Sequence, residues 1–245
     1  MRTVRICQLN APLNLTDEFT LDDDGYGHLV RVLRFKENDE FVVFDGIGHE
    51  YEAVLTKVGK SANYKCTKVI ERNVESPVRV ELGQVISRGD RMEFTIQKAV
   101  ELGIYKITPL YSSRCGVKLD EKRQQKKIEQ WQKIAISACE QCGRNVVPVV
   151  ENIVNIESWY ARSPEALSLT LDPKADKKLT ELEPTGDIRL LIGPEGGLDD
   201  NEIQKAAEHN FVGVTLGPRI LRTETVALVV TGIIMYELEN LEGNK

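Results

Sequence analysis

The sequence predicts an α/β protein, in which a small β domain precedes a larger domain with a mostly parallel sheet. In the first 70 residues, short segments alternate apolar and polar side chains, as β-strands do. From Val78 onward, apolar strands alternate with helices, which is the pattern of a parallel α/β sheet. Late in the chain, two strands each lead into a glycine loop and a helix, which indicates a ligand pocket where neighbouring strands end.

The β domain is expected to span residues 1–72. Its predicted strands are VRIC, EFVVFDG, EYEAVLT and NYKCTKVIE, and glycines 46, 48 and 59 separate them. The segment GHLVRVLRFKENDE predicts a short helix that carries Arg31 and Arg34. Residues 71–77, ERNVESP, have the composition of a linker, so the second domain is expected to span residues 73–245.

The second domain begins with the predicted strand VRVELGQVIS. Asp90 and Glu93 have the spacing of a capping box that opens a helix through Leu102, and Gly103 is expected to close it in a left-handed conformation. A strand, YKITPLYS, and a basic helix over residues 120–142 follow. The remaining predicted strands are NVVPVV, LSLTLDP, IRLLIG and VGVTLG, with helices near Ile156, Ala175, Asn201 and Val226.

Charge is unevenly distributed along the chain. The formal net charge is −6 overall, but it is −2 over residues 1–72, +4 over 73–150 and −8 over 151–245. The basic middle segment permits a phosphate-binding surface on an acidic protein. The start of the chain lacks an apolar core of signal-peptide length, and the apolar run 226–236 is too short to span a membrane. We therefore expect a cytoplasmic protein.

The cysteines predict no metal site. The chain has five, and Cys139 and Cys142 form one CxxC without a second pair or an HxxxH to complete four ligands. Both lie on an apolar helical stripe with Trp131 and Ala135, which favours buried free cysteines.

The two glycine loops, residues 193–197 and 216–221, match neither a P-loop nor a dinucleotide-binding fingerprint. Glycines allow the main chain to approach a ligand closely, so a pocket lined by backbone groups is expected. Glu195 has no capping role and could bind a cationic group. Arg222 lies at a helix N-terminus, where a cation is unfavourable unless an oxyanion or phosphate accompanies it. Capping by Thr223 and the favourable position of Glu224 in the first turn are sufficient to explain both residues.

Five longer segments carry a resemblance to a known family: SRGDRMEFTIQKAVELG, CGVKL, WQKIAISACEQCGRN, LLIGPEGGLDDNEI and LGPRILRTET. They resemble the bacterial RsmE family of methyltransferases, which modify N3 of a uridine in 16S rRNA of the small ribosomal subunit. The similarity covers nearly the whole chain. It implies a SPOUT-type α/β methyltransferase domain with a C-terminal trefoil knot, a PUA-like β-barrel over residues 1–72, and a homodimer.

The resemblance also implies S-adenosylmethionine as the cofactor and assigns residues to three roles. Arg222 is the first candidate for catalysis and Arg144 the second, because a cation can stabilise the uridinate that forms when N3 loses its proton. No dedicated general base is evident; Glu224 is a candidate, but its place in the first turn of a helix explains it better. The residues expected to hold the cofactor are Leu171, Ile192, Gly193, Glu195, Gly196, Gly197, Leu216, Gly217, Ile220 and Leu221. The residues expected to contact RNA are Arg31, Arg34, Arg88, Arg91, Arg114, Lys118, Lys126 and Lys127.

Three alternatives stay open. A non-catalytic RNA-binding or ribosome assembly factor would not bind the cofactor. A methyltransferase of the same fold could act on another RNA or on a ribose hydroxyl, which product analysis would reveal. An unrelated α/β nucleotide enzyme is disfavoured because the phosphate-binding fingerprints are missing.

Overall fold

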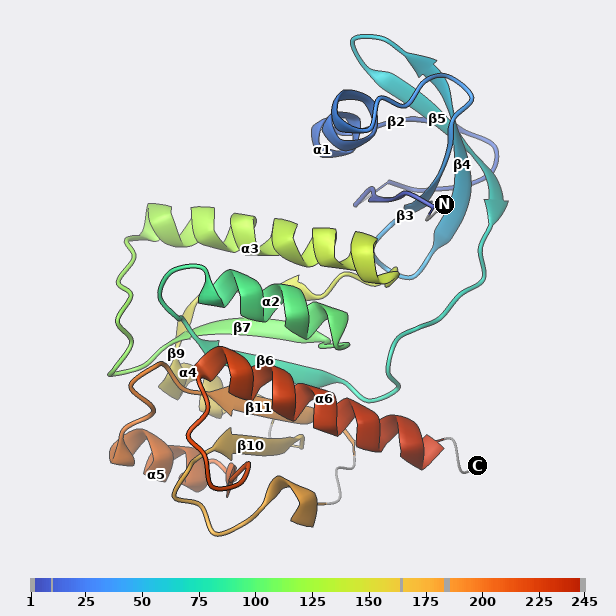
Figure 1. The fold of residues 1–245 in the computed structure, drawn as a ribbon. Coiled ribbons are helices and arrows are strands. Elements are labelled where there is room, and N and C mark those ends of the chain that lie inside the picture. The colour runs from blue at the N-terminus through green and yellow to red at the C-terminus, as the bar shows by residue number, and fades with distance from the viewer. Residues whose placement is uncertain (1–2, 10, 164, 183–185, 243–245) are drawn as a thin grey trace. The chain divides into compact units, whose positions relative to one another are not determined.

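The computed structural model describes residues 3–9, 11–163, 165–182 and 186–242 (Figure 1). The chain forms two compact units, Met1–Glu75 with Ile136–Val147, and Ser76–Ala135 with Pro148–Lys245. The first unit therefore includes a segment from the middle of the chain, which a boundary near residue 72 does not anticipate. Asn145 helps to hold this later segment in the first unit, because its Nδ2 donates to the carbonyl oxygens of Gly48 and Arg72 over 3.1 Å each.

The first unit is built on a five-stranded sheet of order β1-β3-β4-β5-β2. Only β1 and β3 pair in parallel, and the other neighbours are antiparallel. The predicted helix begins earlier than expected, because the Asp22 side chain caps it by accepting from the amide of Gly25. The strands are β1 Arg5–Cys7, β2 Glu18–Thr20, β3 Glu40–Phe44, β4 Glu50–Val58 and β5 Ala62–Val69, and the helices are α1 Asp23–Tyr26 and the π-helix Gly27–Val32.

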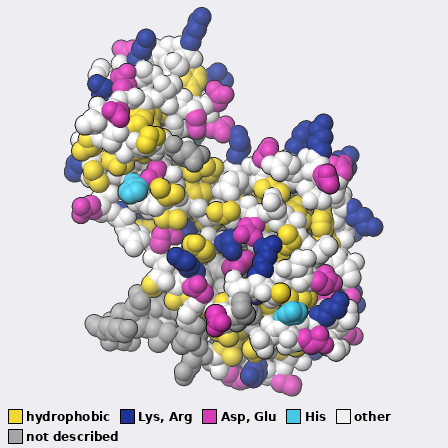
Figure 2. Space-filling view, turned by 180° about the vertical axis from the view of Figure 1, so that it is seen from behind, with side chains coloured by type: hydrophobic (Ala, Val, Ile, Leu, Met, Phe, Trp, Pro, Cys, Tyr) yellow, Lys and Arg dark blue, Asp and Glu magenta, His cyan; other side chains and the backbone are white. Residues whose placement is uncertain are grey.

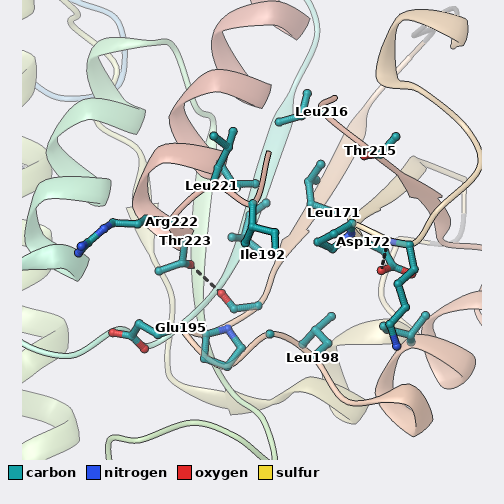
Figure 3. A pocket seen from close by; sticks show the side chains of 18 of the residues that line it. Leu171, Asp172, Ile192, Glu195, Leu198, Thr215, Leu216, Leu221, Arg222 and Thr223 are labelled. Carbon is teal, nitrogen blue, oxygen red and sulfur yellow. Dashed lines mark hydrogen bonds between the residues drawn. The ribbon is translucent and has the colours of Figure 1, made fainter. Parts of the chain in front are cut away.

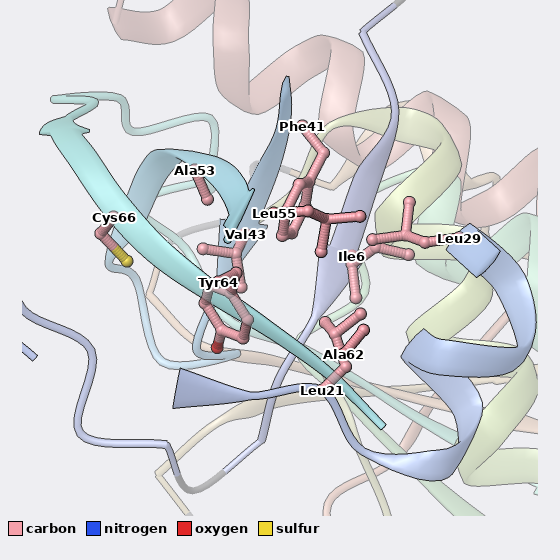
Figure 4. Close-up of a cluster of buried hydrophobic side chains, with 10 residues drawn as sticks. All are labelled: Ile6, Leu21, Leu29, Phe41, Val43, Ala53, Leu55, Ala62, Tyr64 and Cys66. Carbon is pink, nitrogen blue, oxygen red and sulfur yellow. The ribbon is translucent and has the colours of Figure 1, made fainter. Parts of the chain in front are cut away.

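The core of the first unit lies between this sheet and its short helices. Ile6, Leu29 and Leu55 are fully buried and point toward one another, with Phe41 and Tyr64 beside them (Figure 4). The rings of Phe41 and Tyr64 pack edge to face with centroids 5.6 Å apart. The alternating pattern of the sequence is thus explained by strands that bury one face.

The second unit is built on a seven-stranded parallel sheet of order β12-β10-β11-β6-β7-β8, with β9 also paired to β7. Two helices, α2 and α6, lie side by side in Figure 1, and α4 and α5 share a core with β6, β7 and β11. The strands are β6 Val80–Val85, β7 Lys106–Tyr111, β8 Val149–Val150, β9 Val154–Asn155, β10 Leu167–Leu171, β11 Ile188–Ile192 and β12 Val212–Val214. The helices are α2 Arg91–Glu101, α3 Glu121–Cys142, α4 Ile156–Tyr160, the 3-10 helix Leu179–Glu181, α5 Asp200–Glu208 and α6 Thr223–Glu242.

Gly83 in the centre of β6 is required by packing. A Cβ atom built there would lie 2.5 Å from the ring of Trp159, a residue of α4 that packs against the strand. The same indole donates from Nε1 to Glu81 over 3.0 Å, and the Arg189 guanidinium stacks on it at 4.0 Å. A glycine inside a buried strand thus makes room for a large ring.

Two local predictions are wrong. Asp90 has helical backbone angles and no capping hydrogen bond, and Glu93 instead accepts from Lys127 and Gln130 of α3. No α-helix forms near Ala175 in the described part of the loop, where turns lead to the 3-10 helix. By contrast, Gly103 has the expected positive φ, 95°, at the end of α2.

Positive and negative side chains lie next to one another on the face shown in Figure 2. Among the described residues, no helix is both long and apolar enough to cross a membrane. Nor do three or more His, Cys, Asp or Glu side chains converge as metal ligands within the same residues.

Candidate functional site

A cavity of about 760 Å³ opens in the second unit where β10, β11 and β12 end. Because the three strands are parallel neighbours, the loops that follow them emerge at one edge of the sheet. Leu171 ends β10 and Ile192 ends β11, and both line the cavity. Its remaining lining comes mainly from the β11–α5 loop (residues 193–199) and the β12–α6 loop (residues 215–222).

The structure brings most of the predicted cofactor residues together. The leucine side chains of Leu171, in β10, and of Leu216 and Leu221, in the β12–α6 loop, surround the cavity with Ile192 (Figure 3). The other predicted residues that line it are Gly193, Glu195, Gly197 and Ile220. Gly196 and Gly217 belong to the same loops but are not among the lining residues.

The β11–α5 loop turns tightly at its glycines. Gly197 has a φ of 68°, in the left-handed region that favours glycine, and its amide donates to the Pro194 carbonyl over 2.9 Å. Asp199 then begins α5 with the predicted capping box, because its side chain accepts from the amide of Glu202, whose carboxylate accepts from the amide of Asp199 in return.

Two arginines predicted to contact RNA, Arg91 and Arg114, hold this loop. Glu195 Oε1 accepts from the amide of Arg88 and from Arg91 Nη1, each over 2.9 Å. Arg114 Nη1 donates to the carbonyl oxygens of Gly196 and Leu198, over 3.1 and 3.4 Å. Glu195 thus forms an ion pair with the protein's own Arg91.

The environment of Glu195 favours its charged form. Burial by itself raises the pKa of this carboxyl, but hydrogen bonds from the Arg88 amide and the Arg91 guanidinium outweigh it, so the pKa lies below its ordinary value. Arg88 is itself confined, because a Cβ atom on Gly116 would lie 2.3 Å from its Nε. The glycine of the CGVKL segment therefore makes room for Arg88.

The β12–α6 loop is fastened to the first loop by Thr223. Its hydroxyl donates to the Gly193 carbonyl over 2.7 Å and accepts from Gln84 Nε2 over 3.0 Å (Figure 3). Thr223 is the first residue of α6 and not the residue before it. Its side chain links the two loops, which replaces the expected role as a helix cap. Arg222 is exposed, and Figure 3 shows its side chain directed away from the leucines.

The other predicted site residues lie elsewhere. Arg144 belongs to the first unit, where it is buried and forms an ion pair with Glu75. Arg31 and Arg34 are exposed in the first unit, and Arg31 stacks on the Tyr26 ring at 5.2 Å. Lys118 and Lys126 are exposed, whereas Lys127 donates to Glu93 over 3.1 Å.

Sequence reasoning missed a polar group at the cavity. Asp172 accepts from the amide of Lys174, and Lys174 Nζ lies 3.1 Å from the Asp200 carboxylate. All three line the cavity. The sequence feature that could have predicted them is the position of Asp172 and Lys174 directly after a buried strand. Ligand-binding side chains are common at this place in parallel sheets.

Comparisons with known proteins find two domain families in this chain. The model of an RNA methyltransferase domain matches residues 74–235, and that of an RNA methyltransferase PUA domain matches residues 21–62. Ribosomal RNA small subunit methyltransferase E of Buchnera aphidicola (subspecies Acyrthosiphon pisum) is 36% identical over 220 residues, covering 89% of this chain and 87% of the relative. The Bacillus subtilis protein of that name is 34% identical over 240 residues, covering 93% of each.

Two solved structures are similar over nearly the whole chain. A putative methyltransferase from Legionella pneumophila, in complex with the bound cofactor SAM, has a TM-score of 0.92 and 37% identity, covering 96% of this chain and 98% of that one. Ribosomal RNA small subunit methyltransferase E from Neisseria gonorrhoeae, bound to S-adenosyl methionine, has a TM-score of 0.89 and 38% identity with the same coverage.

Proposed function

Because this chain belongs to the ribosomal RNA small subunit methyltransferase E family, we propose that it transfers a methyl group from S-adenosylmethionine to the RNA of the small ribosomal subunit. The observation that carries the proposal is the cavity at the ends of β10, β11 and β12. Two proteins that are 37% and 38% identical to this chain were solved with this cofactor bound. We take N3 of a uridine in 16S rRNA as the methylated atom, as the family resemblance implies.

The residues around the cavity fit S-adenosylmethionine. The volume, about 760 Å³, lies within the range of small-molecule sites. Leu171, Ile192 and Leu221 offer an apolar surface for an adenine ring, and the glycine loops offer main-chain donors and acceptors. The carboxylate of Glu224 lines the same cavity and favours a positively charged ligand. When bound, the cofactor supplies an electrophilic methyl group on a sulfonium.

The protein itself must position the uracil and favour the loss of its N3 proton. We assign Arg222 to this step, because a guanidinium at the cavity can stabilise negative charge that develops on the uracil ring. The second candidate, Arg144, forms an ion pair with Glu75 in the first unit, which is a structural role. We therefore assign only Arg222 to catalysis.

For RNA binding we propose a division among the predicted cations. Arg31 and Arg34 in the first unit and Lys118 and Lys126 in the second are exposed and suited to phosphate contacts. Arg91 and Arg114 serve mainly to hold the β11–α5 loop, since they already bind Glu195, Gly196 and Leu198. Substitution of the first group should lower the salt dependence of RNA binding, whereas substitution of the second should weaken cofactor binding.

The finer features of the fold belong to the same proposal. We propose that the β12–α6 loop takes part in a trefoil knot, which the position of β10 between β12 and β11 supports. We also propose a closed PUA-like barrel for the strands of the first unit. A homodimer through α6 is supported by the exposed Val229 and Tyr236 on that helix. A substrate in the ribosomal subunit places the enzyme in the cytoplasm.

The test is a calorimetric titration with S-adenosylmethionine, followed by methyl transfer from labelled cofactor to small subunits that lack the modification. We expect saturable binding and a product with the methyl group on uridine N3. Arg222→Ala should reduce turnover by about 100-fold with little change in cofactor affinity, and the exposed Arg123→Ala should behave like the wild type. RNA binding without cofactor binding or methyl transfer would instead identify an assembly factor.

A further inference from the structure

Four carboxylates line the cavity, and three of them are already engaged. Asp172 accepts from the amide of Lys174, and Asp200 pairs with the ammonium of the same residue. Glu195 accepts from Arg88 and Arg91, which stabilise its charged form. The fourth carboxylate, Glu224, is in the first turn of α6.

Glu224 is held loosely compared with Glu195. Its Oε1 lies 3.8 Å from Arg91 Nε, beyond hydrogen-bonding distance, and 15% of its side chain is exposed. Its Oε2 is buried and has no hydrogen-bond partner among the described residues. A buried acceptor left unsatisfied is destabilising, so this oxygen is suited to a donor that a bound molecule brings.

We propose that Glu224 accepts the N3 proton of the target uracil. This inference rests on the proposed function and adds the proton acceptor to it. The N3–H bond breaks and its proton passes to a carboxylate oxygen of Glu224. The electron pair on N3 then forms the bond to the methyl carbon, and the pair of the broken C–S bond stays on sulfur.

The arrangement of neighbouring residues suits this role. The terminal torsion of a glutamate has a broad, roughly two-fold preference, so rotation can present either oxygen to the substrate. Arg91 lies near Glu224 without forming a hydrogen bond to it, so the carboxylate stays available to the substrate. Arg222 is two residues away, so the base and the cation that stabilises the uridinate come from one short segment. The other charged groups that line the cavity are Arg114, Asp172, Lys174, Glu195, Asp200 and Arg219.

The experiment compares Glu224→Gln and Glu224→Asp with the wild type in the methyl-transfer assay. Glu224→Gln keeps the size and polarity of the side chain but removes the base, so kcat should fall by about 100-fold or more. The affinity for S-adenosylmethionine, measured by calorimetry, should stay within a few-fold and shows that the cavity is intact. Glu208→Gln, an exposed glutamate outside the cavity, should leave both quantities unchanged.

The pH profile separates a base from a structural residue. In the wild type, kcat should be level near neutrality, because the N3 proton passes to Glu224 rather than to hydroxide. In Glu224→Gln, kcat should instead rise continuously with pH, following ionisation of the uracil, and Glu224→Asp should restore part of the level region. A wild-type profile in Glu224→Gln would overturn the proposal, as would weaker cofactor binding with unchanged kcat. If the wild type transfers no methyl group, the proposed function fails first and the inference fails with it.

Discussion

The Thr223 hydroxyl donates a hydrogen bond to the main-chain carbonyl of Gly193 over 2.7 Å. This contact joins the start of α6 to the end of β11, two segments that the chain separates by 30 residues. Gln84 of β6 donates to the same hydroxyl over 3.0 Å. One buried side chain therefore ties both cofactor loops to the central sheet.

Thr223→Val should destabilise the protein and weaken cofactor binding. The methyl group that replaces the hydroxyl leaves two hydrogen-bonding groups unpaired, at a cost of about 1–3 kcal/mol in the free energy of unfolding. Denaturant unfolding and calorimetric titration measure the two effects. Thr223→Ser retains the hydroxyl and should stay close to the wild type. Equal cofactor affinity in all three proteins would show that the link does not shape the cavity.

Gly197→Ala should impair the cofactor site more than Gly196→Ala does. The φ of Gly197 is 68°, and a residue with a Cβ atom pays about 1–2 kcal/mol there. A Cβ atom on Gly196 would meet Arg114 at an ordinary 3.7 Å, and Gly196 does not line the cavity. Titration with S-adenosylmethionine compares the two variants. The reverse order of affinities would contradict the assignment of this turn.

Gly83→Ala should be strongly destabilising. Trp159 would have to move, because its ring lies 2.5 Å from the new Cβ atom, and such overpacking costs about 1–3 kcal/mol. Gly213→Ala is the matched control, since it adds the same group to β12 of this sheet with its nearest neighbour at 3.5 Å. Chemical denaturation should give a lower midpoint for Gly83→Ala alone.

Glu140→Gln should stabilise the protein at neutral pH. Burial raises the pKa of Glu140 above its ordinary value, although the amide of Cys7 donates to its carboxylate over 3.0 Å. The folded state then binds a proton at Glu140 more tightly than the unfolded state does. The contribution of Glu140 to stability is therefore fully present below the unfolded pKa, about 4.5, and is lost as pH rises through the folded pKa. Glutamine keeps the acceptor without the charge.

The advantage of Glu140→Gln should therefore be present at pH 8 and absent at pH 4. Unfolding midpoints over this range measure it. The control is Glu129→Gln, which changes an exposed glutamate on the same helix and should give no comparable trend. A constant difference across the range would mean that the carboxyl is not the cause.

The sequence predicts the strands of the second unit and the residues of the cavity well, because both depend on local patterns. Parallel strands bury continuous apolar runs, and glycines mark the loops between them. The family resemblance adds the cofactor and the reaction. The partners of individual charges are harder to predict. Arg91, Arg114 and Arg144 all suit phosphate by type, but distant residues, Glu195, Gly196 and Glu75, decide what each one binds.

The spacing of residues along the chain also gives wrong predictions where a side chain finds a partner in another element. Asp90 and Glu93 have the spacing of a capping box, but α3 supplies Lys127 and Gln130 as partners for Glu93. The periodicity of α3 likewise predicts a single helix without saying that its last turns, from Ile136, belong to another unit. Periodicity gives the buried face of a helix and not the identity of what covers it.

The shared helix α3 limits how this protein can be taken apart. Since the first unit needs residues 136–147 as well as 1–75, no single cut in the chain releases it complete. A fragment that ends at the linker would lack the amide of Asn145, which binds Gly48 and Arg72, and the carboxylate of Glu140, which accepts from Cys7. Engineering that exchanges the first unit therefore has to replace two separate stretches of the chain rather than one.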